Sequence, residues 1–187
     1  LGTTNSEIAC CDQGRVRVFD NYLQEKYTPS VVHIDAAGTL TVGRNAYNLA
    51  VRDPENTASE FKRFMGTTHQ VLFKDSGRSL ASEELSAEVL KELKATIKDS
   101  LPEEGDLRAA VITVPANFEL RQCAATQQAA RLAGIEVSPL LQEPIAASIA
   151  YGLLERLPKG YWMIYDLGGG TFDVALMSVR DKQLMVV

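Results

Sequence analysis

Two aspartates enclose a glycine-rich turn near the end of the chain, in the segment 166–173 of sequence DLGGGTFD. Glycine has no Cβ, so the N–H groups of Gly168, Gly169 and Gly170 can close around an anion. Mg²⁺ prefers one or two carboxylates together with phosphate oxygens, and Asp166 and Asp173 could supply the carboxylates. The segment therefore predicts a phosphate and magnesium site. A plain hairpin whose aspartates only favour turns is the alternative.

The first six residues, LGTTNS, offer similar groups at the other end of the chain. Gly2 permits a turn between strands, and Thr3 and Thr4 add hydroxyls to the backbone amides that can bind phosphate oxygens. Taken alone, the segment is equally typical of an ordinary turn. No GxxxxGKS or GxxxxGKT sequence is present, which excludes the commonest class of ATPase.

The composition is that of a chain able to bury a core in one or two domains, with 187 residues of which 45% are hydrophobic. A net charge of -5 argues against general binding to nucleic acid or to anionic membranes. No apolar stretch approaches the roughly 18 residues that span a bilayer, and no basic and apolar leader is visible. We expect a cytoplasmic protein.

The three cysteines do not predict a disulfide framework or a zinc site. Cys10 and Cys11 are adjacent in a strand-like run, Cys123 falls in a helical segment, and neither His33 nor His69 has ligand spacing. We expect small buried apolar side chains in a reducing compartment.

The elements that must position the candidate residues follow from hydrophobic patterns and turn residues. Strands at 161–165 and 172–179 would place the three glycines in a tight turn. Earlier strand pairs are expected at 6–11 with 15–19, 29–34 with 39–42 and 69–74 with 78–81, and single strands at 109–114 and 136–141. Helices are expected at 45–52, 57–65 with Thr57 as cap, 82–101, 119–133 and 144–154.

This order, hairpins first and then alternating strands and helices, predicts a mixed sheet flanked by helices. The segment 157–160, LPKG, looks like a hinge, and only one hairpin's worth of residues follows it. A phosphate loop so near the end suggests the front portion of a larger, two-lobed protein.

The segments 1–6 and 166–173 together resemble the two phosphate loops of the actin-like ATPase superfamily. Three more segments are similar to those of the heat-shock-70 (DnaK-type) chaperones and occur in the same order. They are FKRFMG at 61–66, VITVPANF at 111–118 and QEPIAASIAYGL at 142–153. The resemblance covers essentially the whole chain.

The resemblance implies an α/β fold, namely a truncated actin-like ATPase (ribonuclease H-like) lobe with a mixed sheet flanked by helices. Residues 1–157 would form the first lobe, with a small α+β subdomain inserted at about 30–108. Residues 158–187 would be the opening β-hairpin of the second lobe.

The resemblance also assigns roles to single residues. Gly2, Thr3 and Thr4 would form the first phosphate loop, and Gly168, Gly169, Gly170 and Thr171 the second. The two loops would hold the β- and γ-phosphates of ATP or ADP from opposite sides. Asp166 would lie beside the Mg²⁺ shell and the attacking water, with Asp173 close by. Thr171, in the second loop, would also be one of the catalytic residues.

Three further residues gain meaning from the same match. Lys62 would reach the γ-phosphate, although a lone helical lysine is usually solvated. Glu143 would orient or deprotonate the attacking water, although before Pro144 it could simply favour a helix start. Pro115 would relay the nucleotide state, although it could equally end a strand.

The implied function is Mg²⁺-dependent ATP hydrolysis that controls peptide binding by a C-terminal domain. Client peptides, a J-domain co-chaperone and a nucleotide exchange factor are the implied partners. The chain alone is expected to bind ATP weakly, because the lobe that clamps adenosine is absent. A sugar or acetate kinase of the same fold and an actin-like assembly module are the alternatives.

The chain departs from the family pattern at several positions. The aspartate expected before Leu1 is absent, and Cys123 stands where an arginine is expected. Gln142 and Ile145 replace an asparagine and a threonine. The stretch 69–82 is also short, which suggests a specialised bacterial paralogue.

Overall fold

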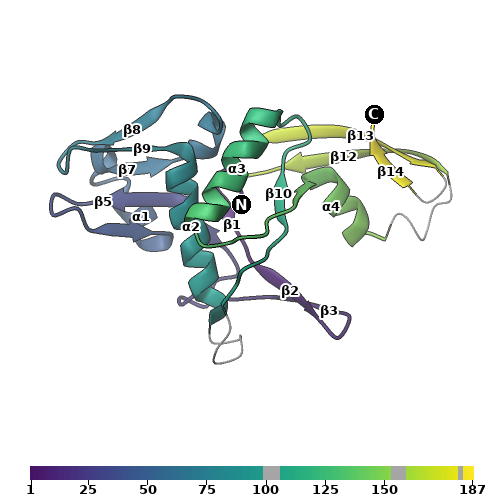
Figure 1. Ribbon diagram of the computed structural model, residues 1–187, viewed down its shortest axis with the longest axis horizontal. Coiled ribbons are helices and arrows are strands. Elements are labelled where there is room, and N and C mark those ends of the chain that lie inside the picture. Colours follow the sequence, from purple (N-terminus) through teal and green to yellow (C-terminus); the bar gives the residue numbers. More distant parts are fainter. Residues whose placement is uncertain (99–105, 153–158, 181–182) are drawn as a thin grey trace.

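The computed structural model describes residues 1–98, 106–152, 159–180 and 183–187. These ranges contain both α-helices and strands (Figure 1). The helices are α1 (Arg44–Leu49), α2 (Ser82–Ile97), α3 (Leu120–Leu132) and α4 (Glu143–Ala150), with 3₁₀ helices η1 (Pro54–Asn56) and η2 (Phe61–Phe64). The strands are β1 (Asn5–Ser6), β2 (Ala9–Asp12), β3 (Arg15–Val18), β4 (Thr28–Pro29), β5 (Val31–Ile34), β6 (Leu40–Val42), β7 (Thr57–Ser59), β8 (Gln70–Phe73), β9 (Arg78–Ala81), β10 (Ile112–Val114), β11 (Leu140–Gln142), β12 (Gly160–Leu167), β13 (Phe172–Arg180) and β14 (Gln183–Val186).

The strands form short ladders instead of one continuous sheet within the described ranges. The ladders are β1–β4, β2–β3, β6–β5–β7, β8–β9, β10–β11 and β12–β13–β14. Strands β10 and β11 pair in parallel and are joined through α3, whereas the other ladders are antiparallel. The fold is therefore mixed α/β, as the sequence predicts, but the expected sheet is divided.

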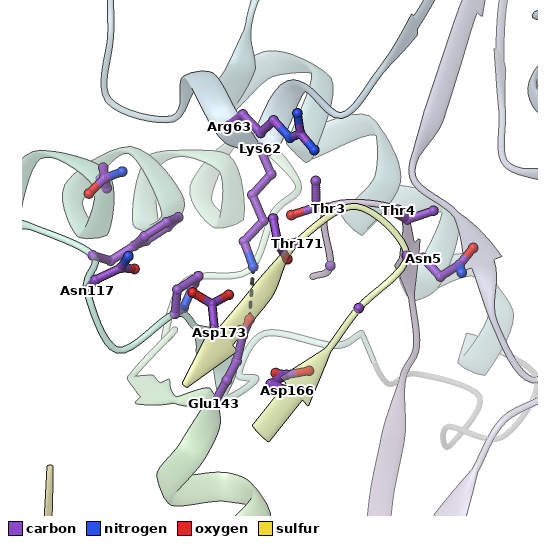
Figure 2. A pocket seen from close by; sticks show the side chains of 16 residues that line it. Thr3, Thr4, Asn5, Lys62, Arg63, Asn117, Glu143, Asp166, Thr171 and Asp173 are labelled. Atoms are coloured by element: carbon purple, nitrogen blue, oxygen red, sulfur yellow. Dashed lines mark hydrogen bonds and ion pairs between the residues drawn. The ribbon is translucent and has the colours of Figure 1, made fainter. Parts of the chain in front are cut away.

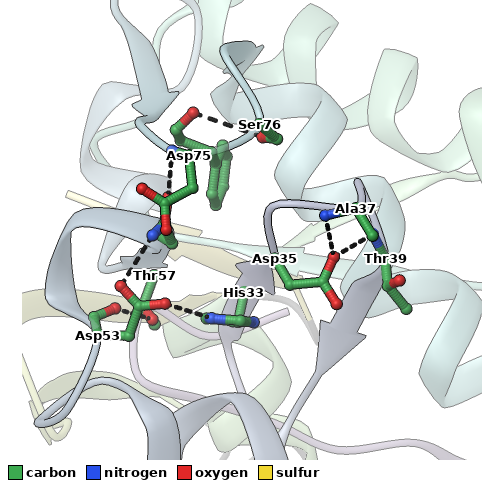
Figure 3. A network of polar contacts seen from close by, with 10 residues as sticks. His33, Asp35, Ala37, Thr39, Asp53, Thr57, Asp75 and Ser76 are labelled. Carbon is green, nitrogen blue, oxygen red and sulfur yellow. Dashed lines mark hydrogen bonds and ion pairs between the residues drawn. The ribbon is translucent and has the colours of Figure 1, made fainter.

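The end of the molecule at the left in Figure 1 is built from β5–β9 and α1. Polar side chains close its turns (Figure 3). Asp35 Oδ1 accepts the N–H groups of Ala37 and Thr39 at 2.9 and 2.8 Å, which fixes the β5–β6 turn. Asp53 Oδ2 lies 3.0 Å from Nε2 of the buried His33 and links β5 to the segment before η1.

Helices α2 and α3 pack side by side in the middle of the molecule (Figure 1). Helix α2 begins where Glu84 Oε2 accepts the N–H of Ala81 at 2.8 Å. The apolar stripe predicted for this helix is buried along its described length, at Leu85, Val89, Leu93 and Ile97. The stripe joins a core cluster that includes Val32, Ile34, Phe61, Phe73, Ile112, Ala129, Ala130 and Ile135.

The sheet β12–β14 covers α4 with one face and leaves the other exposed. Ala175, Met177 and Val179 are buried on the side of α4. The opposite face carries a row of exposed apolar side chains. They are Tyr161, Met163, Tyr165, Leu167, Phe172, Val174, Leu176, Met185 and Val187.

Two sequence predictions are wrong. Residues 57–65 do not form one helix, because Thr57–Ser59 pairs with β5 as β7 and Glu60 turns the backbone into the left-handed region (φ 54°). Cys10 and Cys11 are exposed, because their two-stranded ladder β2–β3 has no covering layer among the described residues.

Other differences concern one additional strand and the ends of predicted elements. Strand β14 was not expected. The predicted ends of the helices 82–101 and 144–154, and half of the hinge 157–160, lie outside the described residues. No helix of the described residues is long and apolar enough to span a bilayer.

Candidate functional site

A cleft of about 420 Å³ brings together residues from opposite ends of the chain (Figure 2). It lies between the N-terminal segment, η2, the loop after β10, the start of α4 and the β12–β13 turn. Its lining contains Gly2, Thr3, Thr4, Asn5, Lys62, Arg63, Pro115, Asn117, Phe118, Gln122, Glu143, Asp166, Gly168, Gly169, Thr171 and Asp173. Of the site residues predicted above, only Gly170 is missing from this lining.

The N-terminal segment is held in a tight turn by two serine hydroxyls. The Gly2 N–H donates to Ser6 Oγ at 3.0 Å, and Ser30 Oγ donates to the Gly2 carbonyl at 2.8 Å. A Cβ on Gly2 would lie 2.0 Å from the carbonyl oxygen of Asn5. Only glycine therefore fits this turn, whose backbone lines the cleft.

The β12–β13 turn presents the second candidate segment. The Gly168 N–H donates to the Thr171 carbonyl at 2.9 Å and closes the turn. Asp166 and Asp173 are direct partners across the two strands, so their side chains lie on one face of the sheet. Like charges in that arrangement repel each other, and a cation between them would remove the repulsion.

The two segments touch each other. A Cβ on Gly169 would lie 2.9 Å from atoms of the Thr4 side chain, and one on Gly170 would lie 3.1 Å from Thr4 Oγ1. Side chains at these positions would push the segments apart. Gly169 therefore has no room for a side chain unless Thr4 shifts, and the space at Gly170 is tight.

An ion pair lies at the base of the cleft (Figure 2). Lys62 Nζ from η2 donates to Glu143 Oε1 at the start of α4, at 2.9 Å, and their side chains are only 5% and 22% exposed. The Lys62 ammonium also lies 5.6 Å from the centre of the Phe118 ring. A charge as buried as Lys62 needs such a partner, so any ligand that draws Lys62 away must replace Glu143.

Magnesium is compatible with the donors present. The described residues contain no group of three or more His, Cys, Asp or Glu side chains able to hold a metal by themselves. Two carboxylates facing a phosphate site suit Mg²⁺, which keeps several waters and takes its other ligands from phosphate oxygens. Asp166 and Asp173 would supply the two carboxylates.

Sequence reasoning missed several residues of the cleft, namely Asn5, Arg63, Asn117, Phe118 and Gln122. Asn117 and Phe118 lie inside a segment already recognised by its likeness to the family, so their position could have been inferred. Asn5 and Arg63 likewise lie inside recognised segments, 1–6 and 61–66. Gln122 is a half-buried helical residue outside these segments, and its placement depends on tertiary packing.

Two of the departures from the family pattern lie near the cleft. Gln142 Nε2 donates to the Ala116 carbonyl at 3.2 Å, which ties β11 to the loop after β10. Cys123 is half-buried on α3, with its thiol 3.9 Å from the Phe118 carbonyl. Both side chains therefore support the loop that contains Asn117 and Phe118.

The family model described as Hsp70 protein matches residues 1–76 and 68–187, and so covers the chain from end to end. The chain belongs to the Hsp70 family. It is 42% identical over 197 residues to a protein of Methylobacillus flagellatus named Chaperone protein HscA homolog. That match covers 96% of this chain and 31% of the relative, so the chain spans about a third of its length. Both matches therefore support the resemblance to the heat-shock-70 chaperones found in the sequence.

Proposed function

We propose that this Hsp70-family chain is the first lobe of an ATP-hydrolysing domain, with residues 158–187 opening the second lobe. The observation that supports it is the convergence of four elements in one cleft. Thr3 of the first segment, Gly169 of the second, Lys62 and Glu143 all line the same space, although they come from distant parts of the sequence. Two backbone segments that face one cavity can bind a polyphosphate from both sides.

In this proposal the backbone amides of Thr3, Thr4, Gly169, Gly170 and Thr171 bind the β- and γ-phosphates, because the N–H groups of Gly2 and Gly168 already close their own turns. The hydroxyls of Thr3, Thr4 and Thr171 add further donors. Asp166 and Asp173 would hold Mg²⁺ through its waters, and the ion would supply positive charge to offset the charge on the phosphate oxygens. These two carboxylates are the protein groups that the proposal assigns to the ion among the described residues.

Lys62 and Glu143 would then act on the γ-phosphate and the attacking water. A bound γ-phosphate competes with Glu143 for the Lys62 ammonium, which frees the carboxylate. Glu143 orients the water and takes its proton as the new bond from oxygen to phosphorus forms. The bond between the γ-phosphorus and the β–γ bridging oxygen breaks, and Lys62 offsets the charge on the phosphoryl oxygens.

Domain boundaries and partners complete the proposal. Residues 1–157 form the first lobe, with a small subdomain at about 30–108. The nucleotide state controls a C-terminal peptide-binding domain in the cytoplasm, with Pro115 as a relay, a J-domain partner and an exchange factor. The support is the family membership and a relative more than three times as long as the matched segment.

The test compares the 187-residue chain with the complete protein that contains it. Calorimetry should show weak or undetectable ATP binding by the chain alone, because the lobe that holds adenosine is missing. The complete protein should release phosphate in the presence of Mg²⁺. Phosphate transfer to acetate or a sugar would favour the kinase alternative, and ATP-dependent sedimentation of large assemblies would favour the assembly alternative. Tight ATP binding by the chain alone would contradict the proposed division into lobes.

A further inference from the structure

Arg63 links the 3₁₀ helix η2 to the β12–β13 turn. Its Nη2 donates a hydrogen bond to the carbonyl oxygen of Gly170, a residue 107 positions further along the chain. Its Nη1 lies 3.2 Å from Glu60 Oε2, and the two side chains are 47% and 46% exposed. One guanidinium group thus joins a carboxylate of its own helical turn to the backbone of the glycine-rich segment.

Glu60 adopts a backbone conformation that is unusual for its residue type. Its φ of 54° and ψ of 16° lie in the left-handed region, which glycine and asparagine occupy more readily than glutamate. A glutamate here carries a conformational cost, because residues with a Cβ are disfavoured in this region. Because a half-exposed ion pair adds little to stability, the pair with Arg63 does not obviously offset that cost.

Gly170 differs from its neighbours in how it faces the cleft. Gly168, Gly169 and Thr171 line the 420 Å³ cavity, whereas Gly170 does not. Its carbonyl points to Arg63, and a Cβ on Gly170 would lie 3.2 Å from Glu60 Oε1. Across a trans peptide the C=O and the next N–H point in opposite directions, so the hydrogen bond from Arg63 directs the Thr171 N–H away from Arg63.

The ion pair of Arg63 and Glu60 also lies at the boundary between two cavities. Arg63 lines the cleft of about 420 Å³, and Glu60 lines a neighbouring cavity of about 310 Å³. Thr3, Thr4 and Asn5 line both cavities. The ion pair of Glu60 and Arg63 therefore joins the linings of the two cavities, next to the Gly170 carbonyl of the second segment.

We propose that Arg63, held in place by Glu60, is a positioning residue that fixes the Gly170–Thr171 peptide so that the second segment presents its N–H groups to the phosphates. This inference rests on the proposed ATPase function. Glu60 acts only through Arg63. Because oriented amides bind the phosphates in the ground state and the transition state alike, loss of the contact affects KM more than kcat.

The experiment measures ATP turnover by the complete protein and its variants Arg63→Ala, Glu60→Gln and the double variant. Arg63→Ala should raise KM for ATP about tenfold and leave kcat within about twofold, as expected for one charge-assisted hydrogen bond. Glu60→Gln should give a smaller rise, and the double variant should match Arg63→Ala alone. Lys91→Ala removes a pair with Glu88 at the same i,i+3 spacing and should change neither constant.

Two further readouts separate positioning from a direct contact with nucleotide or from a stabilising role. In the nucleotide-free complete protein, hydrogen exchange at the Thr171 amide should be faster in Arg63→Ala than in the wild type. Glu60→Asn, which suits the left-handed backbone and removes the charge, should raise Tm while also raising KM. A purely stabilising pair would instead lower Tm in every variant.

The outcomes distinguish this inference from the proposed function. If the wild type hydrolyses ATP and Arg63→Ala keeps its KM and its Thr171 exchange rate, the positioning role is wrong and the ATPase assignment stands. Additive effects of Glu60→Gln and Arg63→Ala would also overturn it. If the wild type does not hydrolyse ATP but Thr171 exchange still responds to Arg63→Ala, the ATPase assignment fails while the structural link is real.

Discussion

Helix α2 and the sheet β12–β14 each have an apolar face, but only the face of α2 is covered. Leu85 on α2 is 0% exposed and lies in the core shared with α3 and the β5 ladder, whereas Tyr165 on β12 is 66% exposed. Contiguous apolar surface of this kind marks a place where something else packs. The cleft lies between η2, which packs against α2, and the β12–β13 turn of this sheet, so its two sides depend on different sources of order.

The proposed catalytic pair and the proposed phosphate- and metal-binding residues depend on these two regions in different ways. Lys62 on η2 belongs to the packed region, because the neighbouring Phe61 lies in the core cluster. Its partner Glu143 begins α4, which packs on the sheet β12–β14, so the ion pair joins the two regions and is already formed in the structure. Asp166, Asp173 and the glycine-rich turn belong to the sheet with the open face. We therefore expect the pair of Lys62 and Glu143 to be preformed. The residues that bind phosphate and metal on the β12–β13 turn should become fully ordered only when the exposed face of the sheet is covered.

The largest expected effect is on turnover, at the packed side of the cleft. Lys62→Ala in the complete protein should lower kcat about 100- to 1000-fold, the usual loss when one group that stabilises developing charge is removed. Single-turnover phosphate release measures it. Lys94→Ala, which removes the pair with Asp106 outside the cleft, serves as control and should be neutral. Undiminished turnover in Lys62→Ala would remove the role assigned to this lysine.

Next in size is the stability difference between the two regions. In the 187-residue chain, Leu85→Ala should lower the free energy of unfolding by about 2–5 kcal/mol, because it leaves a cavity in the core. Tyr165→Ala should change it by less than about 0.5 kcal/mol, because the side chain is exposed. Denaturant titration of both variants gives the comparison.

The same two variants, made in the complete protein, test whether the exposed face of the sheet is buried there. If further chain covers the sheet, Tyr165→Ala should there cost about 2 kcal/mol or more, as a buried aromatic does. The Leu85→Ala loss should stay unchanged. A neutral Tyr165→Ala in both forms would mean that this face is not a buried interface.

A smaller effect is expected on the metal dependence, at the open side of the cleft. Asp166→Asn and Asp173→Asn should each raise the Mg²⁺ concentration for half-maximal turnover about tenfold or more, since each removes a negative charge facing the ion. EDTA should abolish turnover in the wild type. Turnover that is indifferent to Mg²⁺ in wild type and variants would contradict the assignment of these carboxylates.

The smallest expected effect is a pH dependence at the turn between β5 and β6, far from the open sheet (Figure 1). Hydrogen bonds from the backbone N–H groups of Thr39 and Ala37 hold the pKa of the Asp35 carboxyl below its ordinary value. The resulting stability is present above the unfolded pKa of about 4 and is lost as the pH falls through the lower folded pKa. Asp35→Asn should therefore be less stable than the wild type at pH 7, with a gap that narrows below about pH 4. A gap independent of pH would contradict this.

Much of the local structure could be predicted because it depends on local patterns. The hairpins around Gly14, Gly38 and Gly77, and the stripe of α2, follow from turn residues and from apolar spacing. The segment 57–65 could not be predicted in this way. The pairing of β7 with β5 and the left-handed Glu60 depend on neighbours distant in sequence.

The candidate site was predictable to a different degree. The carboxylates and glycines of 166–173 predict a phosphate site by their chemistry, but Lys62 and Glu143 carry no signal of their own and were found only through the likeness to a family. Their 2.9 Å contact joins residues 81 positions apart. Arg63 and Gly170 both lie in segments recognised by that likeness, but nothing in the sequence predicts the contact between them, which spans 107 positions.

Hydrogen exchange with and without ATP and Mg²⁺ tests the central claim most directly, measured on the complete protein. The claim is that Gly2–Thr4 and Gly168–Thr171 bind one triphosphate together. We predict that the amides of both segments become protected in parallel as ATP is added, with the same half-saturation concentration. Protection of one segment without the other, or of neither while ATP is being hydrolysed, would contradict the account.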